Sequence, residues 1–185
     1  MTERPTTDDR TTSIDRSAGT DGALRAELYL RGDAHAGLGV QEVVNRANRL
    51  EANGVLSESM VAGTWHRCHT QAEDWRSEAM ETYEEFRAWA EANDFSLEPG
   101  FQQRSRSFIG MDDVEEVVVF PAIALALYGA GDLVAVFPCT DDDRTYTVER
   151  ALAAFEHDDQ SWLTQFEPLV TDRPGPRLEP EVTMN

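Results

Sequence analysis

The chain has 185 residues and a formal net charge of −19, because 35 acidic residues face 16 arginines and no lysine. This length suits one domain with a substantial core, and the longest apolar run, residues 117–128, is too short to span a bilayer. A charge of −19 lies far outside the roughly 2–8 units that suit a small domain, and the repulsion it causes is screened only at high salt, where the Debye length falls to about 3 Å. The composition therefore indicates a halophilic protein from a cytosol kept at molar salt.

Both ends of the chain differ in composition from its middle. Residues 1–22 are mainly Thr, Asp, Arg, Ser and Gly, and residues 171–185 hold three prolines. We expect a disordered N-terminal tail over 1–22, a single α+β domain over 23–170 and a flexible C-terminal tail over 171–185. The first tail lacks the apolar stretch of a secretory signal, and two cysteines do not make a secreted disulfide framework. We therefore expect a cytoplasmic protein without a membrane partner.

The first half of the domain alternates strands and helices. Residues 25–30 predict a strand, which a glycine-rich loop over 32–39 connects to a helix over 40–53. Residues 57–68 predict a second strand. Thr70 and Glu73 form a capping-box pattern, and the apolar stripe that follows predicts a long helix ending near Asn93.

The second half has the period of two that is typical of strands. We expect strands over 101–108, 116–128 and 132–137, with a hairpin turn at 129–131 and a bulge or break at Pro121. Thr147 predicts the start of a short helix, and residues 162–169 predict a last helical piece. The order is β-α-β-α-β-β-β-α, which predicts an α+β fold of ferredoxin-like type. Its single antiparallel sheet would have about five strands, with two to three helices packed on one face.

The residues that could carry chemistry are few. His66, Cys68 and Cys139 are the candidates for a metal site, but the H-x-C-H spacing matches no standard zinc pattern. A Cys–His catalytic pair is also disfavoured, since the acids at 141–143 would raise the pKa of the Cys139 thiol. The loop over 32–39 lacks both nucleotide-binding glycine patterns, and a chain without lysine cannot form a P-loop. We expect no enzymatic activity, no metal and no cofactor.

The segment over 45–65 has the pattern of a recognition helix running into a wing, as in winged helix-turn-helix proteins. Arg46 and Arg49 would be its contacts to DNA phosphates or guanines. Such a domain needs two more helices upstream, where this chain offers a strand. The alternative is an ordinary amphipathic helix with two solvated arginines.

Several motifs between Glu27 and Phe155 resemble an uncharacterised haloarchaeal family that is commonly labelled as helix-turn-helix (HTH) domain proteins. The matching residues are Leu28-Tyr29-Leu30-Arg31, Val44, Arg49-Leu50-Glu51, Trp65, Phe86-x-x-Trp89-Ala90, Leu97-Glu98-Pro99, Pro121-x-x-x-Leu125-Ala126-x-Tyr128 and Leu133-x-x-Val136-x-Pro138-Cys139-x-Asp141. The resemblance implies a role in transcription regulation.

Three hypotheses follow for a small halophilic protein without catalytic activity. The first is a transcription-associated regulator that contacts DNA or a partner protein. The second is an interaction module that forms a homodimer, or docks on a partner, without binding DNA. The third is a metal-binding protein that uses His66 and Cys68.

Overall fold

The computed structural model describes residues 24–34, 37–70, 77–107, 114–142 and 144–157. The two predicted tails and the predicted helical piece at 162–169 lie outside these ranges. The elements in chain order are β1 (Leu24–Arg31), α1 (Leu38–Ala52), β2 (Leu56–Trp65), β3 (Cys68–Thr70), α2 (Glu78–Ala92), β4 (Gln102–Ser107), β5 (Val114–Val119), β6 (Ile123–Gly129), β7 (Asp132–Phe137), β8 (Cys139–Thr140), β9 (Thr145–Tyr146) and α3 (Val148–Glu156).

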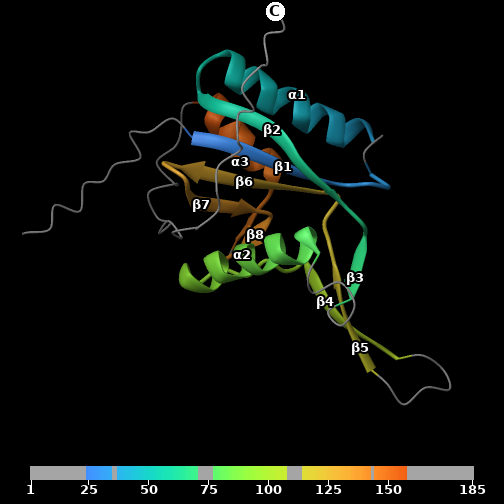
Figure 1. The fold of residues 1–185 in the computed structure, drawn as a ribbon. Coiled ribbons are helices and arrows are strands. Elements are labelled where there is room, and N and C mark those ends of the chain that lie inside the picture. Colours follow the sequence, from blue (N-terminus) through green and yellow to red (C-terminus); the bar gives the residue numbers. More distant parts are fainter. Residues whose placement is uncertain (1–23, 35–36, 71–76, 108–113, 143, 158–185) are drawn as a thin grey trace, which may run out of the picture.

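The main sheet has four strands in the order β2-β1-β6-β7 (Figure 1). Strands β1 and β2 are parallel, because α1 carries the chain from the end of one to the start of the other. Strand β6 runs antiparallel to both β1 and β7. β1 and β6 are the central strands, and most of their side chains on both faces are buried.

Helices cover both faces of this sheet. The side chains of Tyr29 and Tyr128 point to α2, where the Tyr29 ring meets Phe86 edge to face and the Tyr128 hydroxyl donates to Glu85. Leu28 alternates with Tyr29 and therefore points to the other face, where α1 and α3 pack against each other and against the sheet. In Figure 1 the strands accordingly lie between α2 on one side and α1 on the other.

A second sheet extends from the first. It has the order β3-β5-β4, with both pairings antiparallel. Strand β2 leads into β3, and β5 leads into β6, so two chain segments connect the sheets (Figure 1). A backbone hydrogen bond joins the two segments where they cross: the amide of Phe120 donates to the carbonyl of Arg67 at 2.9 Å. The β4–β5 hairpin projects away from the main sheet as an arm.

Local sequence signals explain most of the helix boundaries. The hydroxyl of Ser77 accepts a hydrogen bond from the amide of Met80 and caps α2. Thr147 caps α3 in the same way, as the sequence predicts. Gly54 ends α1 with a positive φ of 73°, a conformation that glycine adopts at little cost. The predicted cap at Thr70 is wrong, since Thr70 lies in β3 and pairs with Val117.

The α+β class is confirmed, with three helices among the described residues. The predicted single five-stranded antiparallel sheet with the stated order, covered by helices on one face, is wrong. The stretch predicted as one strand over 116–128 divides into β5 and β6 around Phe120 and Pro121. Proline has no amide hydrogen and cannot continue a ladder in mid-sheet. The break assigns the two halves to different sheets. The four-stranded sheet is mixed, and helices pack on both its faces.

Among the described helices, none is long and apolar enough to cross a membrane.

Candidate functional site

The structure places Arg46, the first predicted DNA contact, between α1 and α3. Its Nε and Nη2 donate to the two carboxylate oxygens of Glu156 at 2.8 and 2.7 Å. The Arg46 side chain is only 17% exposed. The hydrogen bonds to Glu156 raise the pKa of Arg46, and the same bonds lower the pKa of Glu156. Glu156 therefore neutralises the charge of this guanidinium, which solvent reaches only in part.

Arg49, the second predicted contact, lies on the outer face of α1. Its Nη2 is 3.1 Å from Glu42 Oε1, and both side chains are more than half exposed. Such a pair is weak in water because solvent and salt screen it. The structure therefore does not bring Arg46 and Arg49 together as one anion site. Both remain predictions as DNA contacts, and Arg49 is the more accessible of the two.

The three candidate metal ligands lie on different elements. His66 is exposed just after β2, Cys68 is in β3, and Cys139 is buried in β8. In the parts of the chain that the structure describes, no three His, Cys, Asp or Glu residues group to hold a metal ion. Burial, and then the charge of Asp141, raise the pKa of the Cys139 thiol to about 12. This thiol is protonated at neutral pH and cannot serve as an activated nucleophile.

A groove of about 740 Å³ lies at the junction of the two sheets, and three arginines line it. Arg31 comes from the end of β1, Arg67 from the link between β2 and β3, and Arg104 from β4. We call this the arginine groove. Its other lining residues are neutral: Gly100, Gln102, Ser105, Val117, Val119, Phe120 and Pro121. No carboxylate is among its described lining residues, in a chain with 35 acids.

The three guanidinium groups of the groove have different partners. Arg31 donates to the carbonyl of Phe120 at 3.2 Å and forms an ion pair with Asp33, which is not among the lining residues that the structure describes. Arg104 donates to the side chain of Gln102, which is neutral. Arg67 is exposed and its side chain makes no hydrogen bond or ion pair with any residue that the structure describes. Two of the three positive charges, at Arg67 and Arg104, are therefore not neutralised by a described acid.

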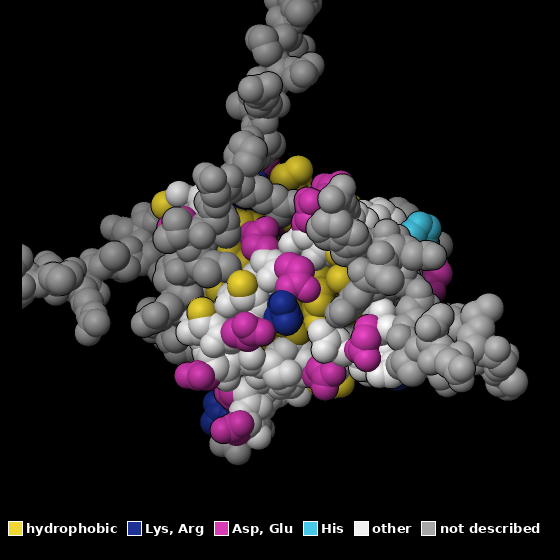
Figure 2. Space-filling model, turned by 60° about the horizontal axis from the view of Figure 1, so that its bottom comes forward, with side chains coloured by type: hydrophobic (Ala, Val, Ile, Leu, Met, Phe, Trp, Pro, Cys, Tyr) yellow, Lys and Arg dark blue, Asp and Glu magenta, His cyan; other side chains and the backbone are white. Residues whose placement is uncertain are grey.

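Acids are the more frequent charged residues on the face that Figure 2 shows. Figure 2 shows many Asp and Glu side chains and few arginines over the face that α2 forms. On the arm, Glu116 accepts a hydrogen bond from Ser105, which lines the groove, at 2.8 Å. The arginine groove is thus a local positive region on a strongly negative molecule.

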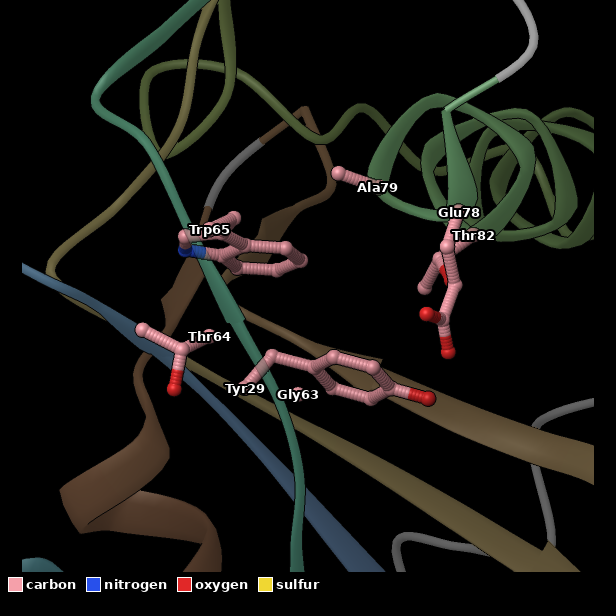
Figure 3. Close-up of a pocket in the computed structure, with 7 residues that line it drawn as sticks. All are labelled: Tyr29, Gly63, Thr64, Trp65, Glu78, Ala79 and Thr82. Carbon is pink, nitrogen blue, oxygen red and sulfur yellow. The ribbon is translucent and has the colours of Figure 1, made fainter.

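A second, much smaller pocket lies between the main sheet and the start of α2 (Figure 3). The rings of Tyr29 and Trp65 stack on one side of it at 5.3 Å, and Glu78 and Thr82 approach from α2. Its volume is about 70 Å³, which is room for about two water molecules and far below the roughly 300 Å³ of small-molecule sites. The pocket is best explained as a packing gap beside the aromatic core.

Sequence reasoning missed the arginine groove. Its arginines lie at positions 31, 67 and 104, and only the crossing of β2–β3 with β5–β6 brings them together. One local signal was present, namely the all-polar run QQRSRS of β4, which carries arginines without an acid in an otherwise acidic chain.

Residues 18–160 match the model of a family described as a helix-turn-helix domain. The chain belongs to this family. No curated protein and no solved structure matches the chain.

The elements seen in the structure do not follow each other as in a helix-turn-helix motif, in which two helices are joined by a short turn. Two strands separate α1 from α2, and six strands separate α2 from α3. The description of the family therefore supports a DNA-related role, while the helix pair that would carry it is absent from the described elements.

Proposed function

We propose that this protein is a transcription-associated regulator that contacts DNA and has no catalytic activity. The observation that carries the proposal is membership of the helix-turn-helix domain family over residues 18–160. The arginine groove adds a surface whose charge suits a phosphate backbone.

The net charge of −19 does not contradict DNA contact if the protein works in a salt-rich cytosol. At about 1 M salt the Debye length is about 3 Å, so distant acids no longer repel the phosphates. Contacts between a phosphate and an arginine at hydrogen-bond distance persist under the same conditions, although they become weaker.

Retention on DNA tests the proposal directly. Full-length protein is passed over immobilised DNA from its own source organism in KCl at the concentration where its circular dichroism shows a folded chain. We expect retention that a soluble DNA competitor removes. Flow-through of all the folded protein would reject the DNA-contact role.

A second candidate function is homodimerisation through the edge of the main sheet. Strand β2 is ten residues long and pairs only with β1 among the described strands, and its Val61 is 43% exposed. At the opposite edge, the indole of Trp89 donates to the carbonyl of Val134 in β7. An edge strand of this length could pair with β2 of a second copy about a two-fold axis, which gives a closed dimer.

Light scattering after size exclusion in high salt tests this alternative. A dimer that Val61→Lys converts to a monomer, together with no retention on DNA, would favour the interaction module over the regulator.

A further inference from the structure

We propose that the arginine groove is the DNA-contacting surface, and that Arg67 and Arg104 bind phosphates of the DNA backbone. This inference rests on the proposed function, and it places the DNA contact at the groove and not on the face of α1.

The charge distribution favours a phosphate ligand. The described lining of the groove contains three arginines and no carboxylate, although acids outnumber arginines 35 to 16 in the chain. Arginine presents a planar fork of N–H donors that matches the oxygens of a phosphate. A random surface of this chain would carry more acids than arginines, so the composition of the groove indicates an anionic ligand.

The arginines of the groove differ from those of α1 in their hydrogen-bond partners. Arg46 is committed to Glu156 through two short hydrogen bonds, and Arg49 has an acid 3.1 Å away. Arg67, by contrast, has no side-chain partner among the described residues, and Arg104 bonds only to a neutral amide. A phosphate at the groove would meet two arginines that no described carboxylate neutralises, whereas Arg46 is already neutralised by Glu156.

The β4–β5 arm places Arg104 where the two sheets meet. Beyond β3, the hairpin of β4 and β5 projects from the body as a two-stranded ribbon (Figure 1), and Arg104 pairs with Val117 at the level where β3 ends. The described part of the ribbon beyond this level carries Glu115 and Glu116. The arginines at its foot, and not the ribbon itself, are therefore the proposed phosphate contacts.

The test compares three double variants of the full-length chain, each losing two positive charges. Arg67→Gln/Arg104→Gln changes the proposed surface. Arg46→Gln/Arg49→Gln changes the face of α1. The matched control is Arg87→Gln/Arg144→Gln, which removes two exposed arginines that do not line the groove.

The readout is the affinity for a fluorescent DNA duplex, measured by anisotropy across a range of KCl in which circular dichroism shows every variant folded. Each lost phosphate contact reduces the slope of log affinity against log salt by about 0.9, so two lost contacts reduce it by about 1.8. Over a fourfold rise in salt, from about 0.25 to about 1 M, the advantage of the unmodified chain over the groove variant should shrink by about 12-fold.

A fourth variant, Arg67→Lys/Arg104→Lys, keeps both charges. It should restore most of the salt slope, since a lysine also neutralises a phosphate. This result would separate loss of phosphate contact from a change in the fold of the arm.

The outcomes separate the two proposals. If the unmodified chain binds and only the groove variant loses slope, the inference stands. If the chain binds and the groove variant behaves as the control does, the inference is overturned while the DNA role survives. If the folded chain binds no DNA, the proposed function is rejected and the inference falls with it. If poly-glutamate competes as well as DNA at equal charge, the groove binds an acidic protein segment and the inference is overturned.

Discussion

The ion pair between Arg46 and Glu156 should stabilise the fold, and a double-mutant cycle can measure by how much. Two N–H groups of Arg46 donate to the two oxygens of Glu156 at 2.8 and 2.7 Å, and the side chains are 17% and 35% exposed. Exposed pairs contribute about 0.2–1 kcal/mol, and hydrogen bonds to buried charged groups contribute about 1.5–3 kcal/mol. Solvent reaches Glu156, so we expect a coupling free energy of about 1 kcal/mol. Breaking the pair should lower Tm by about 2–4 °C.

The dependence on pH gives this prediction a second readout. The bonds from Arg46 lower the pKa of Glu156 in the folded chain. The stabilisation is therefore fully present above the ordinary glutamate pKa of about 4.3, and it is lost as the pH falls through the lowered value. Urea unfolding of the unmodified chain, Arg46→Ala, Glu156→Ala and the double variant, at constant KCl, gives the coupling at each pH.

The exposed pair of Arg49 and Glu42 supplies a matched control on the same helix, since both side chains are about 60% exposed. Its coupling should be at most about 0.5 kcal/mol. If the coupling of Arg46 with Glu156 is equally small, or is the same at pH 7 and at low pH, then Arg46 is not held by α3. Both Arg46 and Arg49 would then be available on α1 to bind a phosphate.

Three further changes test the packing around the groove and the sheet. Gly100→Ala should destabilise the chain by about 1–3 kcal/mol in urea unfolding, because the added Cβ would overlap the ring of Pro138. Trp89→Phe should cost about 1–3 kcal/mol, since it leaves a buried carbonyl of β7 without the indole donor 2.9 Å away; a loss no larger than that of an exposed substitution would refute it. In a Cys68→Ser background, Cys139 should react with a thiol reagent at pH 8 only as fast as the chain unfolds, because its pKa is raised to about 12. A fast reaction under native conditions would contradict the burial of this thiol.

The elements that the sequence predicted best have local causes. Strand β7 occupies the predicted residues 132–137, and Thr147 caps α3 as its hydroxyl at the helix start indicates. The period of two, the positive φ of Gly54 and the capping hydroxyl all act within a few residues. Such features can be read from a sequence because no distant part of the chain is needed to produce them.

The features that the sequence did not predict depend on distant parts of the chain. Proline indicates the break at Pro121, but no local pattern encodes the parallel pairing of β1 with β2 or the assignment of β5 and β6 to different sheets. The role of Arg46 shows the same limit. Its exposed-looking position on an amphipathic helix says nothing of Glu156, which lies 110 residues away in sequence and 2.7 Å away in space.

The acidic net charge is compatible with the proposed DNA contact because salt shortens the distance over which charges act. At about 1 M salt a charge acts over about 3 Å, which is the length of one hydrogen bond. Under these conditions the net charge of −19 has little influence on a phosphate, and the immediate neighbours of each arginine decide whether it can bind one. Arg46 already has a carboxylate at that distance, whereas Arg67 has no described partner and Arg104 has only a neutral one.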